Sequence, residues 1–468
     1  METSHASDFM GTEPVHRLLR RFALPAMVSC LVNCLYNIVD RLYLGHAVGP
    51  DAIAGLALTM PYMIVLTAFG MMIGQGSGAM VSLMLGEKRQ EEADRVLGQA
   101  LALYLLFIFT FQALGLLFLD QTLRFMGTTG AALPHARAYL QIILWGNIFQ
   151  HLSFGGSNIV RAEGDSLAAM GVIVLGAVMN IVLDPVFIFW LGMGIRGAAV
   201  ATILSMAISS SWVMAHFLRG KTLRLRLRNI RLHWHLLGRV LSIGLAPCIM
   251  QCLNSVIFIF YNRGFLRYAE SEGQATICIA AFGIVNPILI ALLMPAFGIN
   301  MGVQPIIGYN TGARLYRRVR KALTLTEGLG TAISIALTVA CFFLARPLVS
   351  LFCPTGDLIH MATYGLRVTL PGLSFICVGI VTSTYYQSTG RASVSILVGC
   401  LRQGVVLIPM LLLLPWLWGV KAVWWAGPIS DAVAGILSGI LLAHECRRLK
   451  RLEQECPVPP SSPSFPAP

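Results

Sequence analysis

The chain has 468 residues, of which 56% are hydrophobic and only 12% are charged. Soluble domains usually carry about 25% charged residues, so this composition excludes a surface that faces water on all sides and favours one that faces a lipid bilayer. In a soluble protein, the net charge of +13 would suggest a nucleic-acid partner. Here most Lys and Arg residues lie between apolar runs, so we expect no nucleic-acid partner.

The apolar runs predict an all-α membrane protein with twelve transmembrane helices. Each run has the roughly 20 residues that a crossing needs, and the runs are too long and too uniformly apolar for the strands of a barrel. The first six helices are expected at 18–43, 53–83, 96–119, 136–158, 167–191 and 196–218. The second six are expected at 237–264, 275–305, 322–345, 360–386, 394–417 and 421–444.

The positions of Lys and Arg predict the orientation in the membrane. Cytoplasmic loops carry an excess of these residues, and here most of them lie in the two tails and in every second loop. The most basic loop, RGKTLRLRLRNIRLHWHLLGR, follows the sixth predicted helix. We therefore predict a multi-pass protein of the cell inner membrane with both termini in the cytoplasm.

An internal repeat divides the chain into two similar halves. FGMMIG at 69–74 reappears as FGINMG at 297–302, and WLGMGIRGAAVATILS is similar to WLWGVKAVWWAGPIS in the second half. Because six is even, the copies share one orientation, which predicts two lobes related by a parallel pseudo-two-fold axis and a central cleft. The predicted parts are an N-terminal tail at 1–17, an N-lobe at 18–218, a basic linker at 219–236, a C-lobe at 237–446 and a Pro/Ser-rich tail at 447–468.

Acidic side chains inside two of the predicted N-lobe helices indicate an ion site. Asp40 lies four residues after Tyr36, and Asp184 lies four after Asn180, so each pair shares a helix face. Pro185 removes a backbone donor and is expected to kink its helix and free a carbonyl. A charge at the bilayer centre costs at least about 2.5–3.5 kcal/mol, so these carboxylates need a proton, a cation or a partner. Oxygen ligands suit hard cations such as Na⁺.

Two other interpretations stay open at this point. Asp40 could pair with Arg41 or Arg196 at the outer mouth, with the second carboxylate merely capping a broken helix. In the last predicted helix, Asp431 could form a secondary polar site or simply pack against Arg402. No metal other than Na⁺ at the N-lobe carboxylates is expected.

The remaining motifs argue against an enzyme. GQGSG at 74–78 lies in an apolar helix without the strand–turn–helix context of a nucleophile elbow. No GxxxxGK[ST] sequence is present, so an ion gradient rather than ATP is the expected energy source, and no cofactor is expected. The glycines at 70, 74, 76 and 78 are interpreted as close helix-packing positions.

A set of segments together resembles the multidrug and toxic compound extrusion (MATE) family over residues 17–445. They are LYNIVDRLYLGHAVG (35–49), GSGAMVSLMLGEKR (76–89), RAEGDSLAAMGVIVLGAVMNIVLDPVFIF (161–189), GIRGAAVATILS (194–205), GVQPIIGYNTGARLYRRVRKAL (302–323), RQGVVLIPMLLLLP (402–415) and GPISDAV (427–433).

The resemblance implies a drug/cation antiporter of two six-helix lobes. In DinF-like members a cluster in the N-lobe binds the coupling cation, and here it falls on Asp40, Asn180, Asp184 and Thr202, with Tyr36 beside it. Thr202 comes from the resemblance alone. The NorM-like branch uses acidic residues in helices seven and ten, but the predicted tenth helix has no Asp or Glu. The chain therefore resembles the DinF-like or MepA-like branch.

These observations predict a secondary active exporter of small organic compounds, cationic and amphipathic, that works as a monomer by alternating access against H⁺ or Na⁺. A flippase of lipid-linked precursors is the first alternative, but it should line its cleft with several cationic side chains, and Arg402 is the main base predicted inside the membrane. A membrane-embedded enzyme would need a His, Asp or Ser cluster at one membrane face, which the sequence does not indicate.

The predicted orientation is testable by labelling. Cysteines placed near His46 and Gly194 should react with an impermeant thiol reagent added outside intact cells, whereas Arg226→Cys should not, because the basic linker is predicted inside. Labelling of Arg226→Cys from outside would reverse the orientation.

Overall fold

The computed structural model describes residues 7–47, 50–125, 132–220, 222–352 and 356–455, and the regular structure of these residues is entirely helical. The first half holds α1 (Phe9–Thr12), α2 (Val15–Ala47), α3 (Pro50–Gly86), α4 (Gln90–Leu117), α5 (Leu119–Phe125), α6 (Ala132–Ala162), α7 (Ser166–Pro185), η1 (Val186–Trp190) and α8 (Ile195–Leu218). After η2 (Leu227–Asn229), the second half holds α9 (Trp234–Tyr268), α10 (Glu272–Gly312), α11 (Tyr316–Ser350), α12 (Asp357–Thr369), η3 (Leu370–Gly372), α13 (Leu373–Ser388), α14 (Ala392–Cys400), η4 (Leu401–Leu407), α15 (Ile408–Trp418) and α16 (Ala422–Glu455).

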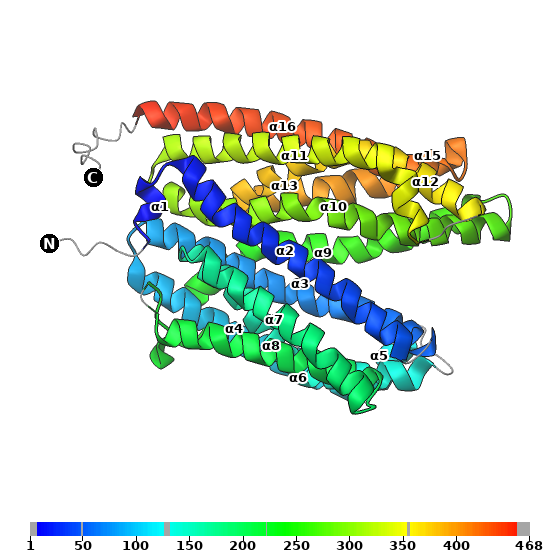
Figure 1. Cartoon of the computed structure of the whole chain (residues 1–468). Coiled ribbons are helices and arrows are strands. Elements are labelled where there is room, and N and C mark those ends of the chain that lie inside the picture. The colour runs from blue at the N-terminus through cyan, green and yellow to red at the C-terminus, as the bar shows by residue number, and fades with distance from the viewer. Residues whose placement is uncertain (1–6, 48–49, 126–131, 221, 353–355, 456–468) are drawn as a thin grey trace.

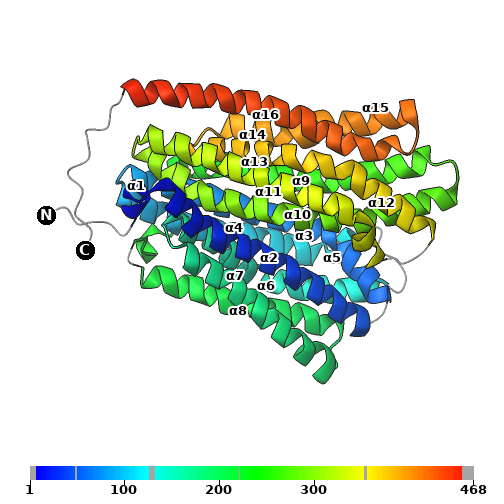
Figure 2. The same cartoon turned by 45° about the horizontal axis from the view of Figure 1, so that its top comes forward.

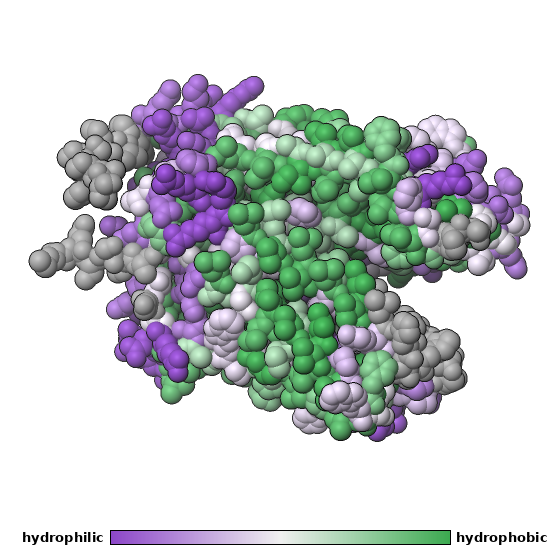
Figure 3. Space-filling model, in the orientation of Figure 1, coloured by the Kyte–Doolittle hydropathy of each residue, from purple (hydrophilic) through white to green (hydrophobic). Residues whose placement is uncertain are grey.

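The prediction of an all-α membrane protein is confirmed. Among the described residues, eleven segments are long and apolar enough to cross a membrane, with α12–α13 and α14–α15 each counted once. The remaining predicted helix, 136–158, corresponds to α6, which is 31 residues long but includes His135, Arg137, His151 and Arg161 and is therefore less apolar. The face shown in Figure 3 carries a green apolar belt between two purple polar ends.

The helices form two lobes that α2 links. We call α2–α8 the N-lobe and α9–α16 the C-lobe. In Figure 1 the C-lobe lies above the N-lobe, and α2 crosses obliquely in front of both. Figure 2 shows α2 along the same boundary. This helix packs on α10 of the C-lobe and on α7 of its own lobe.

The first and last helices end at the same end of the bundle. The helix α1 and the last turn of α16 both lie at the left of Figure 1, and we call this the tail end. At the opposite end, Figure 3 shows a notch between the lobes. The predicted C-terminal tail lies largely outside the described residues.

At the tail end the lobes meet along a seam of very close helix contacts, formed by α2 and α3 against α9 and α10. A Cβ added to Gly302 of α10 would lie 2.7 Å from the Cα of Ala23 in α2, and one added to Gly76 of α3 would lie 2.2 Å from the carbonyl oxygen of Val240 in α9. Small residues let helix backbones approach to this degree in membranes. The predicted packing role of Gly76 is therefore confirmed.

Two helices change their winding near prolines. Regular α-helix ends at Pro185 in α7 and continues as the π-helical turn η1, and the π-helix η4 runs up to α15, which has Pro409 at its start. Proline lacks an N–H and cannot continue the ladder of hydrogen bonds. Such π-helical turns are frequent at functional sites.

Glycine-to-alanine changes test the seam. Gly302→Ala should lower the free energy of unfolding by about 1–3 kcal/mol, the usual cost of overpacking, because backbone atoms of α2 leave no room for a methyl group. Gly328→Ala, in α11, is the matched control: nothing lies within 4 Å of its added Cβ, so the higher helix propensity of alanine should leave stability equal or raised. Thermal unfolding in detergent measures both, and an equal loss in both variants would contradict the packing described.

Candidate functional site

The N-lobe contains a buried cluster of polar side chains on one face of α7. Asn180 and Asp184 lie one turn apart and are 1% and 0% exposed. The Asn180 Nδ2 donates to Asp184 Oδ1 at 3.2 Å and to Thr202 Oγ1 of α8 at 3.3 Å. The amide of Asn180 therefore ties a carboxyl and a hydroxyl from neighbouring helices into one group.

The helix α2 brings the second carboxyl to this group. The carboxyl of Asp40 lies close enough to that of Asp184 for the two to interact directly. Tyr36 is one turn earlier on α2, and both it and Asp40 lie near the phenol of Tyr139. The structure thus brings together all five residues predicted for the ion site. We call Tyr36, Asp40, Tyr139, Asn180, Asp184 and Thr202 the N-lobe pocket.

Tyr139 of α6 is a member of this pocket that the sequence did not indicate. It is 8% exposed and lies near enough to Asp40 and Asp184 to interact with them electrostatically. A single tyrosine in an apolar helix is ordinary, so only the packing of α6 against α7 and α8 reveals its position.

The pocket has the ligand chemistry of a proton or hard-cation site. The side-chain oxygen of Asn180 is buried and has no hydrogen-bond partner among the described residues. Two carboxyls, an amide oxygen and hydroxyls are the oxygen ligands that hard cations prefer. Because all of these ligand atoms are oxygens, the set resembles a site for Na⁺ or a proton rather than for a transition metal. The described residues contain no group of three or more His, Cys, Asp or Glu side chains placed to hold a metal ion.

Arg196 and Arg41 are the alternative partners of Asp40. Arg196 is exposed at the start of α8, and the side chain of Arg41 lies outside what the structure describes. Asp184 lies within the last turn of α7 and accepts a hydrogen bond from Asn180, so it joins the two-helix group rather than only a helix end.

In the C-lobe, Arg402 and Asp431 form an ion pair. Arg402 Nη1 donates to Asp431 Oδ1 at 3.1 Å, and Ser430 Oγ donates to the carbonyl of Arg402 at 2.7 Å. Asn254 of α9 and Gln403 lie within hydrogen-bonding distance beside them, at 2.6 Å. The pair joins the π-helical η4 to α16. The structure therefore brings together Arg402 and Asp431, the two residues predicted for the secondary polar site.

Two charged residues within helices add to those expected from the sequence. Glu327 lies within α11, where its Oε1 accepts from Thr331 Oγ1 at 3.1 Å. The predicted helix 136–158 ends before Arg161, but α6 extends to Ala162 and buries Arg161 to 2% exposure. Arg402 is thus not the only base of the membrane region.

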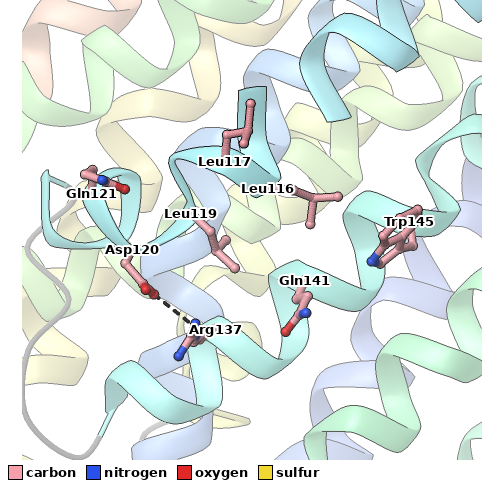
Figure 4. A pocket seen from close by; sticks show the side chains of 8 residues that line it. All are labelled: Leu116, Leu117, Leu119, Asp120, Gln121, Arg137, Gln141 and Trp145. Carbon is pink, nitrogen blue, oxygen red and sulfur yellow. Dashed lines mark ion pairs between the residues drawn. The ribbon is translucent and has the colours of Figure 1, made fainter. Parts of the chain in front are cut away.

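A surface pocket of about 370 Å³ opens at the end of the N-lobe opposite to the tail end. Figure 4 shows Asp120 of α5 and Arg137 of α6 paired across it, at 3.2 Å. Trp145 and Gln141 line one wall. None of the N-lobe pocket residues lines it, so this hollow is separate from the carboxyl pair.

Two repeated helical lobes, an apolar belt and a polar pocket buried in one lobe define a membrane transporter. The MatE family model matches residues 25–186 and 247–413, one segment in each lobe. The chain belongs to the MatE family.

Named relatives of the chain support its assignment to this family. The chain is 25% identical over 443 residues to the multidrug export protein MepA of Staphylococcus aureus (strain MSSA476), covering 93% of this chain and 95% of that protein. It is 26% identical over 436 residues to MepA of Staphylococcus haemolyticus (strain JCSC1435), with the same coverage. The predicted MepA-like resemblance is thereby confirmed.

Solved structures share the fold over nearly the whole length. One is an outward-facing conformation of a multidrug resistance MATE family transporter of the MOP superfamily, with a TM-score of 0.89 and 25% identity over 96% of this chain and 100% of that one. Another is a MOP superfamily transporter from Pyrococcus furiosus, with a TM-score of 0.89 and 26% identity over the same shares.

Ion binding to the N-lobe pocket can be tested by stability alone. A cation at about 100 times its Kd stabilises a folded protein by about 2.7 kcal/mol. We expect either Na⁺ at constant pH or added protons at constant Na⁺ to raise the melting temperature in detergent, and Asp184→Asn to abolish that response because it removes a carboxylate ligand. Asp165→Asn is the matched control: Asp165 caps the other end of α7 by accepting from the backbone N–H of Ala168 at 2.9 Å. Asparagine is as good an N-cap as aspartate, so this variant should keep both its stability and its ion response. A full ion response in Asp184→Asn would rule out the pocket.

Proposed function

We propose that this protein is a secondary active multidrug exporter that exchanges cationic, amphipathic organic compounds for H⁺ or Na⁺. The observation that carries this proposal is the contact between the carboxyls of Asp40 and Asp184 inside a lobe where lipid surrounds the helices. Membership of the MatE family and the names of the MepA relatives support multidrug export. The resemblance to an outward-facing transporter supports alternating access.

The proposed orientation places the tail end in the cytoplasm of the cell inner membrane. The excess of Lys and Arg in the tails and in alternate loops supports it. In this orientation the seam closes the cytoplasmic side, and the notch between the lobes faces outward. The N-lobe pocket and the seam both lie within one chain, so a monomer suffices for the proposed cycle.

Charge in the N-lobe pocket couples to the position of α2. Two ionised carboxylates at close range in a medium of low dielectric constant repel each other strongly. A proton or Na⁺ taken up between Asp40 and Asp184 removes this repulsion, and its release restores it. Since Asp40 lies on α2 and Asp184 on α7, the repulsion acts across the contact between these two helices.

The helix α2 also connects the N-lobe pocket to the seam. Ala23 of α2 lies against Gly302 of α10, 17 residues before Asp40, which is about 25 Å along an α-helix. A shift or bend of α2 at the pocket therefore changes the fit of the seam. Packed interfaces of this kind hold one of two arrangements rather than deforming continuously, which gives the lobes a closed and an open seam.

Asparagine substitutions test the coupling. Asp40→Asn and Asp184→Asn should each abolish gradient-driven export, because asparagine keeps the shape of the side chain and removes its charge, while insertion into the membrane persists. The double variant should be little worse than either single one, since residues that act as a unit are not additive. Binding of the organic substrate should persist, because its contacts are expected in the cleft.

Efflux from vesicles under an imposed Na⁺ gradient and, separately, an imposed proton gradient measures this effect and also identifies the coupling ion. Direct binding of the same substrate is measured in parallel. Coupled efflux near the wild-type rate in Asp184→Asn would contradict the N-lobe pocket as the coupling site and direct attention to Asp431 in the C-lobe.

A further inference from the structure

Some of the buried polar groups without partners lie on α3, α6 and α10, three helices that contact one another. Ser77 Oγ of α3, Asn300 Oδ1 and Gln304 Nε2 of α10, and Arg161 Nε and Nη2 of α6 are all buried, and none has a hydrogen-bond partner among the described residues. Buried polar groups are almost always hydrogen-bonded, so each of these groups can gain a partner in another arrangement of the lobes.

Arg161 is the charged member of this set, and its geometry suits an oxyanion. Its Nη1 donates to Asn158 Oδ1 at 3.1 Å, which leaves the Nε–Nη2 edge without a partner. Two parallel N–H groups on one guanidinium edge match the two oxygens of a carboxylate or phosphate. Arg161 takes part in none of the ion pairs formed within the described ranges.

The acidic residue nearest in sequence is already engaged. Glu163 follows α6 and is 5% exposed. Its Oε1 contacts His216, and its Oε2 accepts from the backbone N–H of Leu223 at 3.1 Å. Burial raises the pKa of the Glu163 carboxyl. This carboxyl therefore holds the linker after α8 against the N-lobe and does not serve as the counter-charge of Arg161.

The helix α2 passes near Arg161 and also contacts the C-lobe. Cys30 of α2 lies near the guanidinium, and Cys30 Sγ is 3.7 Å from Met301 Sδ of α10. On the other side, a Cβ added to Gly78 of α3 would lie 3.2 Å from the carbonyl oxygen of Asn158. Arg161 thus lies where α2 passes from the N-lobe onto α10. Separation of α2 from α10 would uncover it toward the tail end.

We infer that Arg161 binds an oxyanion, the carboxylate or phosphate of a ligand, in a vestibule that opens between the lobes when the seam separates. This inference rests on the proposed alternating access and adds a ligand class to it. Ser77, Asn300 and Gln304 line the same vestibule with neutral donors and acceptors. The exporter thereby accepts zwitterions, whose carboxylate meets Arg161 on the tail side, as well as simple cations.

A matched pair of substrates tests the inference in proteoliposomes: an aromatic amine that carries a carboxylate, and the methyl ester of the same compound. In Arg161→Gln the ratio of kcat/KM for the carboxylate to that for the ester should fall at least about tenfold, the value of one lost charge-assisted hydrogen bond. In Arg161→Lys the ratio should fall less, because an ammonium keeps the charge but not the two parallel donors. Arg196→Gln, at an exposed arginine of the opposite end, is the control and should not change it.

A second arm distinguishes a lipid phosphate from a substrate carboxylate. Wild type and both Arg161 variants are compared in vesicles of phosphatidylethanolamine alone and with added phosphatidylglycerol. If the oxyanion belongs to a lipid, the added phosphatidylglycerol should raise the wild-type rate at least about threefold and leave the variants unchanged, while the substrate ratio stays constant.

Failure of the two proposals can be told apart. If wild type exports neither compound under either gradient, the proposed export function is wrong. If it exports both, and the Arg161 variants alter neither the substrate ratio nor the response to phosphatidylglycerol, the oxyanion site is wrong. An impermeant thiol reagent on the tail side should label Cys30, kept as the sole cysteine, faster when the seam opens during transport. A Cys30 that never reacts during active export would also overturn the vestibule.

Discussion

The contact between Asp40 and Asp184 is the interaction on which the rest of this structure depends. Asp184 has no exposed surface, and its carboxyl faces another carboxyl. Asn180 and Thr202 supply hydrogen bonds to the group but no positive charge. Ionising both acids in such surroundings is costly, so uptake of a proton or cation would stabilise the pair. Because the acids belong to two different helices, any change in their charge alters the electrostatic interaction between α2 and α7.

The geometry of α2 turns that local force into a property of the whole molecule. At one end this helix contributes Tyr36 and Asp40 to the pocket, and at the other its backbone lies against Gly302. Contacts between backbones leave no soft side chains to absorb a displacement, so the seam either fits or separates. Arg161 lies near Cys30 of the same helix, and its Nε and Nη2 have no partner among the described residues. The proposed vestibule would thus adjoin the helix that also contributes to the pocket and to the seam.

Much of this architecture could be predicted from the sequence. Apolar runs located the helices, the repeat gave two lobes, and the four-residue spacing of Tyr36–Asp40 and Asn180–Asp184 placed each pair on one face. What the sequence could not supply depends on packing between helices. Tyr139 has no local signature, and α6 continues beyond the end of its apolar run, so the run does not include Arg161. Glu327, in contrast, lies within an apolar run and can be recognised from the sequence. The π-helical turns beside Pro185 and before Pro409 also need the structure, because a proline alone does not determine how its helix rewinds.

The central claim is that the N-lobe pocket controls the seam through α2, and one crosslinking measurement tests it most directly. With Cys30 as the only native cysteine and Met301→Cys on α10, oxidation joins two side chains whose sulfur atoms lie 3.7 Å apart in the closed seam of the native sequence. Saturation with the coupling ion should lower the crosslinking rate at least about threefold, because neutralising the carboxyl pair frees α2 to leave α10, and Asp184→Asn should remove this dependence on the ion. A crosslinking rate that responds to the ion equally in both proteins would contradict the account.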